Sequence, residues 1–369
     1  MMKFRVIKEN PMGARLGILK INGKKAETPL LWLSCSIRNK PYPWKYFEVN
    51  AVMVNAYELI KKGILVESIH KFLGINGLIM MDSGGFQILR RKVRISPSEI
   101  IRVYKKAKPD IGVVLDYPLD PSDLSSWAKR WRKTLINTKF MLDNSYDVVL
   151  MPVIHGYTID DIRKACKEIK DITDPKIIGI GSMVPIVRQM YTSKLLELNN
   201  VTTFKLIVET ILTVRREFSD AFLHVFGIGS VTTMHLMFSL GVDSVDSMSW
   251  RIKAAYGAIQ LPRVNDRFIS PKDGRKPLKE IDLLSKCKCP ICNGKSLEDR
   301  KIALDNSRPN TFYNRAIHNA YVLKQEEFMF RKFLTEGKVI EFIRSRLQGT
   351  RYHSLINWLT NKKLFDYDL

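Results

Sequence analysis

Short aliphatic runs recur along the first 250 residues, and longer polar stretches with helical spacing separate them. Most runs lack polar alternation, which is typical of strands buried on both faces of a parallel sheet. The stretches between them predict helices, and one begins with a capping box formed by Ser96 and Glu99, with Pro97 in its first turn. The eight candidate strands start near Leu31, Ala51, Gly77, Asp110, Asp147, Lys176, Ala221 and Gly241.

Eight strand and helix units over roughly 250 residues predict an α/β fold, a (β/α)8 barrel, over residues 1–265. A doubly wound open sheet is the alternative. After residue 265 the pattern changes to a basic, turn-rich segment with clustered cysteines, which predicts a zinc-binding subdomain over residues 266–325. Residues 326–369 contain helix-like segments rich in Lys, Arg and aromatic residues, and they predict a basic helical tail.

Polar residues stand at the carboxyl ends of the predicted strands, where barrel enzymes build their active sites. Asp82 precedes a Ser-Gly-Gly segment whose backbone a ligand can approach closely, although an Asp helix cap is the alternative. Asp243 and Asp246 are three residues apart and face opposite sides of a strand, so we expect only Asp246 in the site. The strand-end residues are Asp82, Asp116, His155, Ser182, Ser230 and Asp246.

His155 is a further candidate for catalysis or base binding, because it ends a strand and precedes a glycine. A histidine with a purely structural role is the alternative. The turns 179–183 and 227–230 are glycine-containing strand ends that can bind phosphate, although such turns are common.

Cys287, Cys289 and Cys292 have the spacing C-x-C-x-x-C, and His318 follows in a predicted helix. Three thiolates and one imidazole make a closed tetrahedral zinc site, and a closed site is structural rather than catalytic. His353 also lies downstream and is the alternative fourth ligand.

Charge points to a polyanionic partner. The chain of 369 residues has 60 Lys and Arg against 37 Asp and Glu, a formal net charge of +23. This excess favours nucleic acid over an anionic membrane surface. Two basic groups follow the strand ends at Asp82 and Asp246, and we expect them to contact backbone phosphates. They are Arg90, Arg91, Lys92, Arg94, Arg251 and Lys253.

The sequence gives no sign of membrane insertion or export. No run of 18 apolar residues occurs, and the N-terminus lacks the apolar core of a signal peptide. Five cysteines, three of them within six positions, fit a reducing compartment and a metal site. We therefore expect a cytoplasmic protein.

Three motifs together resemble the guanine transglycosylases, which insert 7-deazaguanines into nucleic acid. They are "MDSGGFQIL" (81–89), "GVDSVDSMSW" (241–250), and the cysteine motif with "AIHNAYVL" (316–323). The resemblance implies a (β/α)8 barrel with a zinc-bearing subdomain. It also implies base exchange, in which a carboxylate attacks C1′ of a guanosine, guanine leaves, and a 7-deazaguanine takes its place. No redox cofactor is needed, and Zn²⁺ is structural.

Residue by residue, the resemblance implies that Asp246 is the nucleophile and that Asp82 handles the proton. Asp116 is similar to the carboxylate that reads the Watson–Crick edge of the bound base. The remaining residues expected to bind the base are His155, Ser83, Phe86, Gly179, Gly181, Ser182 and Met183.

Two departures bear on the substrate. His155 stands where the tRNA enzymes have a glutamine, and a histidine cannot reproduce an amide's paired donor and acceptor. The chain also ends about 50 residues after His318, whereas archaeal tRNA enzymes continue into further domains. With the divergent first strand, these departures favour the compact DpdA type, which places a preQ0-like base in DNA.

A tRNA-guanine transglycosylase is the alternative. A non-catalytic nucleic-acid-binding subunit is the third hypothesis, against which the presence of both Asp82 and Asp246 argues. The expected partners are nucleic acid and the free base. A second copy of the chain, or accessory proteins that open a duplex, are further candidates.

Overall fold

The aliphatic runs form one parallel sheet that closes on itself. The computed structural model describes residues 2–91, 93–145, 147–188, 200–272, 274–350 and 352–353. Neighbouring strands follow the order β8-β7-β6-β5-β4-β12-β11-β10-β9, and all of these pairs are parallel. The strands are β4 (Leu30–Ser34), β5 (Ala51–Asn55), β6 (Leu78–Asp82), β7 (Ile111–Val113), β8 (Val149–Met151), β9 (Val153–Ile154), β10 (Ile177–Ile180), β11 (Phe222–Val225) and β12 (Ser244–Ser247).

The first and last strands in this order, β8 and β9, are separated in the sequence only by Pro152. They are therefore two halves of one strand. The sheet is therefore a closed barrel of eight strands, which confirms the predicted (β/α)8 fold. Each strand begins within a few residues of its predicted start.

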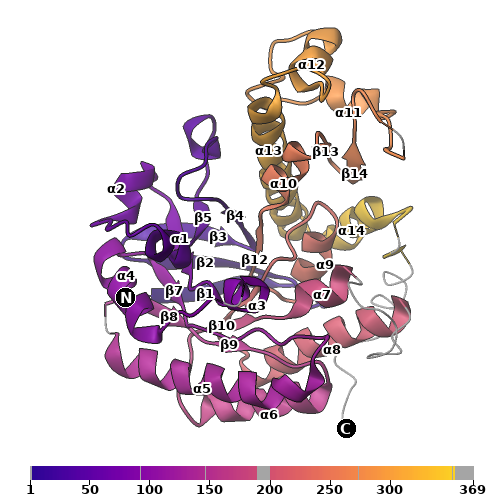
Figure 1. The fold of residues 1–369 in the computed structure, drawn as a ribbon. Helices are drawn as coiled ribbons and strands as arrows, with labels where there is room; N and C mark the ends of the chain where they lie inside the picture. Colours follow the sequence, from indigo (N-terminus) through magenta and orange to yellow (C-terminus); the bar gives the residue numbers. More distant parts are fainter. Residues whose placement is uncertain are drawn as a thin grey trace.

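Helices surround the barrel (Figure 1). The capping box of α4 forms as predicted, because the Ser96 hydroxyl accepts from the Glu99 amide and the Glu99 carboxylate accepts from the Ser96 amide. Within the described residues, no helix combines the length and apolar character needed to cross a membrane. The helices are α1 (Ala56–Lys61), α2 (Ile69–Leu73), α3 (Gly85–Arg91), α4 (Pro97–Ala107), α5 (Trp127–Asn144), α6 (Ile159–Lys170), α7 (Met183–Arg188), α8 (Asn200–Glu217), α9 (Thr233–Ser239) and α10 (Ser249–Ala255).

A three-stranded antiparallel sheet, which is not among the predicted elements, covers the amino end of the barrel. It comprises β1 (Met2–Glu9), β2 (Arg15–Ile21) and β3 (Lys24–Thr28). Leu19 and Ile21 pack in one core cluster with Leu30 and Leu78, which begin barrel strands. This sheet closes the end of the barrel opposite the predicted site.

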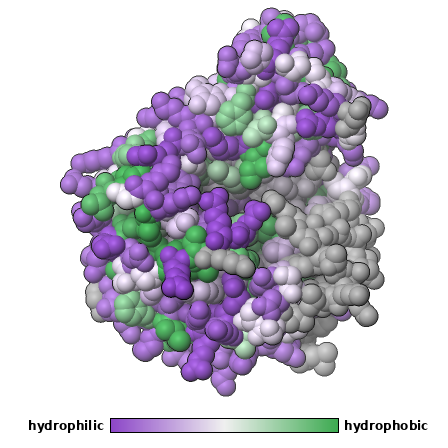
Figure 2. All heavy atoms as spheres, in the orientation of Figure 1, coloured by the Kyte–Doolittle hydropathy of each residue, from purple (hydrophilic) through white to green (hydrophobic). Residues whose placement is uncertain are grey.

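The elements that follow the barrel, β13 to α14, form a C-terminal module. This module lies beside the carboxyl ends of the barrel strands (Figure 1). Figure 2 shows hydrophilic side chains over most of this face and apolar ones where the barrel meets the module. The elements after the barrel are β13 (Ile259–Leu261), β14 (Val264–Arg267), α11 (Ile281–Ser285), α12 (Leu297–Leu304), α13 (Phe312–Thr335) and α14 (Val339–Leu347).

Helix α13 runs without a break across residue 326, where the sequence places a domain boundary. Leu323 and Phe330 of α13 and Phe342 of α14 belong to the main barrel core. Residues of 326–347 therefore pack into the barrel core. The last part of that predicted tail, 354–369, lies outside the described residues.

Buried charges fix α13 against the barrel. Glu327 is fully buried and pairs with Lys324 and Arg331. Lys324 donates to Asn50 Oδ1 (3.1 Å), and Arg331 donates to the Pro29 carbonyl (2.9 Å). Both ion pairs lie within α13, and the hydrogen bonds to Asn50 and Pro29 connect these buried charged groups to the barrel.

Candidate active site and metal centre

A cavity of about 1510 Å³ opens at the carboxyl ends of the barrel strands. Asp82, Asp116 and Asp246 all line it. Residues of α10 and β13 also contribute, so the cavity extends from the barrel to the C-terminal module. Pockets for drug-sized ligands typically measure about 300–1,000 Å³, so this cavity has room for more than a single nucleobase.

Asp246 ends β12 with both carboxylate oxygens engaged. Oδ2 accepts from the Ser34 hydroxyl (2.8 Å), and Oδ1 accepts from the backbone N–H of Gly227 (2.5 Å). His224 Nε2 lies 3.5 Å from Oδ1. Donors that point at both oxygens of a carboxylate fix its orientation.

Asp82 ends β6 beside Asn55, whose amide nitrogen donates to Oδ2 (2.6 Å). The Asn55 oxygen accepts from the Tyr57 amide and caps α1, which fixes which end of the amide faces Asp82. Burial, together with the nearby charges of Asp116 and Asp246, raises the pKa of Asp82 to about 7. At neutral pH the protonated and ionised forms are both populated, as proton transfer requires.

Asp116 follows β7 and is held between two elements. Its Oδ2 lies 3.0 Å from His155 Nε2. A Cβ at position 85 would lie only 2.0 Å from Asp116 Oδ1, so the start of α3 can approach the carboxylate because residue 85 is glycine. This close approach explains why the second residue of the Gly-Gly pair is a glycine.

The other residues predicted to bind the base divide into two groups. Phe86, Gly181 and Ser182 line the cavity. The remaining members do not line it: the Ser83 hydroxyl donates to the Val114 carbonyl (3.2 Å), and the His155 side chain faces Asp116. This second group consists of Ser83, His155, Gly179 and Met183.

Of the predicted phosphate contacts, Arg90, Arg91 and Lys253 line the cavity, with Lys253 paired to Asp266. Arg251 instead donates to the Lys40 carbonyl and lies over the Phe312 ring. Arg94 is exposed but does not line the cavity, and Lys92 lies outside the described residues.

Lys61 and Lys62 at the end of α1 also line the cavity, although they are not among the predicted residues. Within the described part of the chain, no carboxylate pairs with these two lysines, Arg90 or Arg91. These four residues are called the cationic rim below.

Ser34 and Asn55 were also missed, although both end barrel strands, as Asp82 and Asp246 do. Applied to every strand, the rule that polar strand-end residues belong to the site finds both. Gly227 contributes through its backbone, and no side-chain pattern indicates such a contact.

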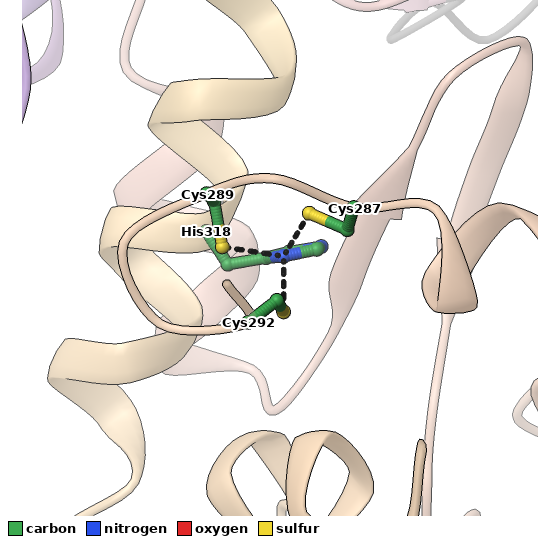
Figure 3. Close-up of side chains that lie close together, drawn as sticks. All are labelled: Cys287, Cys289, Cys292 and His318. Atoms are coloured by element: carbon green, nitrogen blue, oxygen red, sulfur yellow. Dashed lines mark hydrogen bonds between the residues drawn. The ribbon is translucent and has the colours of Figure 1, made fainter. Parts of the chain in front are cut away.

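Cys287, Cys289, Cys292 and His318 form the predicted metal site (Figure 3). The three sulfur atoms lie 3.6, 3.5 and 3.7 Å from His318 Nδ1. Tetrahedral zinc with ordinary Zn–S and Zn–N bonds places such atoms about 3.6 Å apart, so the geometry fits zinc. His318 Nε2 donates to the Gln260 carbonyl (2.9 Å), which leaves Nδ1 free to bind the metal.

This closed set of four ligands fits structural zinc, as the sequence predicts. His318, rather than His353, is the fourth ligand. Because His318 belongs to α13, a metal here joins the cysteine loop to the helix that packs into the barrel.

The family model described as "Queuine tRNA-ribosyltransferase" matches residues 10–352. The chain belongs to this family. The match covers the barrel, the metal site and all of α13 and α14, so the strand-end carboxylates and the zinc ligands lie within it.

Curated relatives named "tRNA-guanine(15) transglycosylase" are about a quarter identical to the chain over the aligned residues. The relative from Pyrococcus furiosus is 26% identical over 377 residues, covering 100% of this chain and 59% of the relative. That from Methanopyrus kandleri is 27% identical, covering 92% and 71%. That from Methanocaldococcus jannaschii is 28% identical, covering 94% and 52%. The chain thus spans 59% of the length of the Pyrococcus relative.

Proposed function

We propose that the protein is a guanine transglycosylase that exchanges a guanine in tRNA for a 7-deazaguanine base. One observation carries the proposal: a fixed carboxylate, Asp246, and a carboxylate with a pKa of about 7, Asp82, line one cavity with Asp116. Membership of the family and the names of the relatives support it.

In the proposed reaction, a carboxylate oxygen of Asp246 attacks C1′ of the target nucleotide. A C1′–O bond forms as the bond from C1′ to the guanine nitrogen breaks, and the electron pair leaves with the base. Ser34 and the Gly227 amide hold the attacking group in place, which lowers the entropy cost of the attack. The product is a covalent nucleotide–enzyme intermediate.

Asp82 moves the proton. Its protonated form gives a proton to the departing guanine, and the carboxylate that remains accepts one from the incoming base. The incoming base then attacks C1′ and releases Asp246. A pKa of about 7 suits both half-reactions, since neither proton transfer is strongly uphill at neutral pH.

Asp116 is the proposed recognition group for either base, because a carboxylate accepts hydrogen bonds from two neighbouring N–H groups. Phe86, which lines the cavity and is exposed, offers a ring for stacking. Zinc bound by the three cysteines and His318 supplies structure, since its ligand set is closed.

The choice between tRNA and DNA rests on the relatives. The departures in the sequence favour DNA, whereas the names of the relatives favour tRNA. His155, the main departure, pairs with Asp116 and does not line the cavity, so it does not by itself select a polymer. We therefore place tRNA first.

Exchange of radiolabelled guanine into purified tRNA and plasmid DNA, measured side by side, tests the proposal. We expect incorporation into tRNA that depends on time and on enzyme. Incorporation into DNA alone would reinstate the DNA hypothesis. Incorporation into neither polymer, from protein with full zinc content, would leave the non-catalytic subunit as the function.

A further inference from the structure

His155 and Asp116 form a pair at the wall of the cavity. Asp116 lines the cavity, whereas His155 is 2% exposed and does not. His155 Nε2 lies 3.0 Å from Asp116 Oδ2. An effect of His155 on a bound ligand must therefore pass through a residue that it contacts, such as Asp116.

The other ring nitrogen of His155 belongs to a short polar chain. The Leu119 amide donates to the Ser182 hydroxyl oxygen (2.9 Å), and this oxygen lies 2.9 Å from His155 Nδ1. Because Ser182 already accepts a hydrogen bond from Leu119, its own hydrogen is available to Nδ1. The ring proton of a neutral His155 then sits on Nε2, which lies 3.0 Å from Asp116 Oδ2 without a well-aligned hydrogen bond.

The position of the ring is fixed by its surroundings. A Cβ at position 181 would lie 2.4 Å from His155 Cε1, so the imidazole fills the space that glycine leaves at this position. Trp131 packs edge to face against the ring. Ser182 has φ of +62°, an uncommon value for a residue with a side chain, and its two polar contacts offset the cost of that conformation.

We propose that His155 is a positioning residue that presents Asp116 to the free purine base and sets base affinity without touching the base. The inference rests on the proposed function. His155 lies against Oδ2 and the start of α3 at Gly85 lies against Oδ1, so neighbours on both oxygens limit the positions that the carboxylate can take. A carboxylate held in this way matches a base edge with two adjacent N–H groups, such as the N1 and N2 edge of guanine.

The test is a double-mutant cycle on guanine exchange into tRNA, with kcat and KM determined for free guanine. His155→Ala should raise this KM about 10–100-fold, because it removes the polar ring nitrogen that faces the Asp116 carboxylate at 3.0 Å, and kcat should change less than about 3-fold. With Asp116→Asn already present, His155→Ala should lower kcat/KM by less than about 2-fold, because the amide can no longer accept from two base N–H groups and His155 has no carboxylate to position. His155→Gln retains an N–H donor and should recover part of the affinity.

Ser182→Ala is the second variant, since it removes the donor to Nδ1 and leaves His155 in place. We expect a smaller rise in the guanine KM, about 3–10-fold, as for a neutral hydrogen bond. If His155→Ala does not fold, the guanine KM of Ser182→Ala tests the inference instead. Zinc content and the thermal midpoint serve as folding controls for every variant.

Equal losses from His155→Ala in the wild-type and Asp116→Asn backgrounds would overturn the inference, because His155 would then act independently of Asp116. A fall in kcat at unchanged KM would overturn it as well. These outcomes differ from failure of the proposed function, in which the wild-type protein exchanges no guanine.

Discussion

Asp82 and Asp246 have different surroundings, and the difference suits them to different roles. Asp246 receives hydrogen bonds on both oxygens, which hold the attacking group that a nucleophile presents in a fixed orientation. Burial and two neighbouring carboxylates raise the pKa of Asp82, which favours a group that exchanges protons. These surroundings fit the proposal that one aspartate acts as the nucleophile and the other as the acid in one cavity.

The pKa of Asp82 predicts how guanine release depends on pH. The first half-reaction needs the protonated acid, so its rate should hold below pH 7 and fall as the pH rises above about 7. Asp82→Asn should lower the rate about 10²–10⁴-fold and remove this dependence, because the amide does not titrate in this range. Single-turnover release of guanine from tRNA, between pH 5.5 and 9, measures both effects. A wild-type rate that rises across this range would contradict the assignment.

The rule that polar residues at strand ends belong to the site predicts where these residues lie along the barrel. It does not predict as well where their side chains point. It places Asp82, Asp116 and Asp246 at one end of the barrel, and all three line the cavity. Ser83 and His155 satisfy the same rule, yet Ser83 donates to a backbone carbonyl and His155 faces Asp116. Direction depends on neighbours from other strands, which one strand's sequence does not specify.

Among the structural elements, the sequence predicts best those whose defining residues are close together in the chain. The cysteine spacing identifies the metal loop because three ligands fall within six residues. The N-terminal sheet is different, since the alternating polar and apolar residues of β1 and β2 acquire a buried face only against the barrel. Helix α13 likewise spans two predicted units, because its two halves pack against different partners.

Removing one metal ligand should loosen the module and leave the barrel intact. The module's own core is a small cluster that includes Cys289 and Cys292, so metal binding supplies much of its stability. We expect the wild-type protein to contain one zinc per chain and Cys289→Ser to lose it. Elemental analysis measures the zinc, and limited proteolysis of residues 268–310 reports the loosening.

Cys166→Ser is the matched control, because Cys166 is buried in α6 and lies outside the metal site. It should retain its zinc and resist the protease. Equal zinc content in Cys289→Ser and the wild-type protein would refute the metal site.

For the whole molecule, the net charge is +23, and part of this positive charge lies at the cavity that contains the carboxylates. The cationic rim of Lys61, Lys62, Arg90 and Arg91 borders the cavity, without carboxylate partners in the described part of the chain. The cavity is also larger than one base requires. Both features fit a nucleic acid whose backbone lies along the rim while one nucleotide enters.

Replacing rim lysines should weaken polymer binding and spare the free base. The double variant Lys61→Gln, Lys62→Gln should reduce the slope of log K against log salt for tRNA by about one to two, with the KM for guanine unchanged. The control is Lys164→Gln with Lys167→Gln, two exposed lysines on α6 that do not line the cavity. Equal slopes for the rim and control variants would place the polymer elsewhere.

The central claim is that Asp246 forms a covalent bond to the target nucleotide. The most direct measurement is denaturing electrophoresis and mass analysis of the protein after incubation with a tRNA substrate, with free base omitted. We predict an adduct of protein and RNA with the wild-type chain and none with Asp246→Asn, in samples of equal zinc content. An adduct of equal yield with Asp246→Asn, or guanine exchange by that variant at the wild-type rate, would contradict the account.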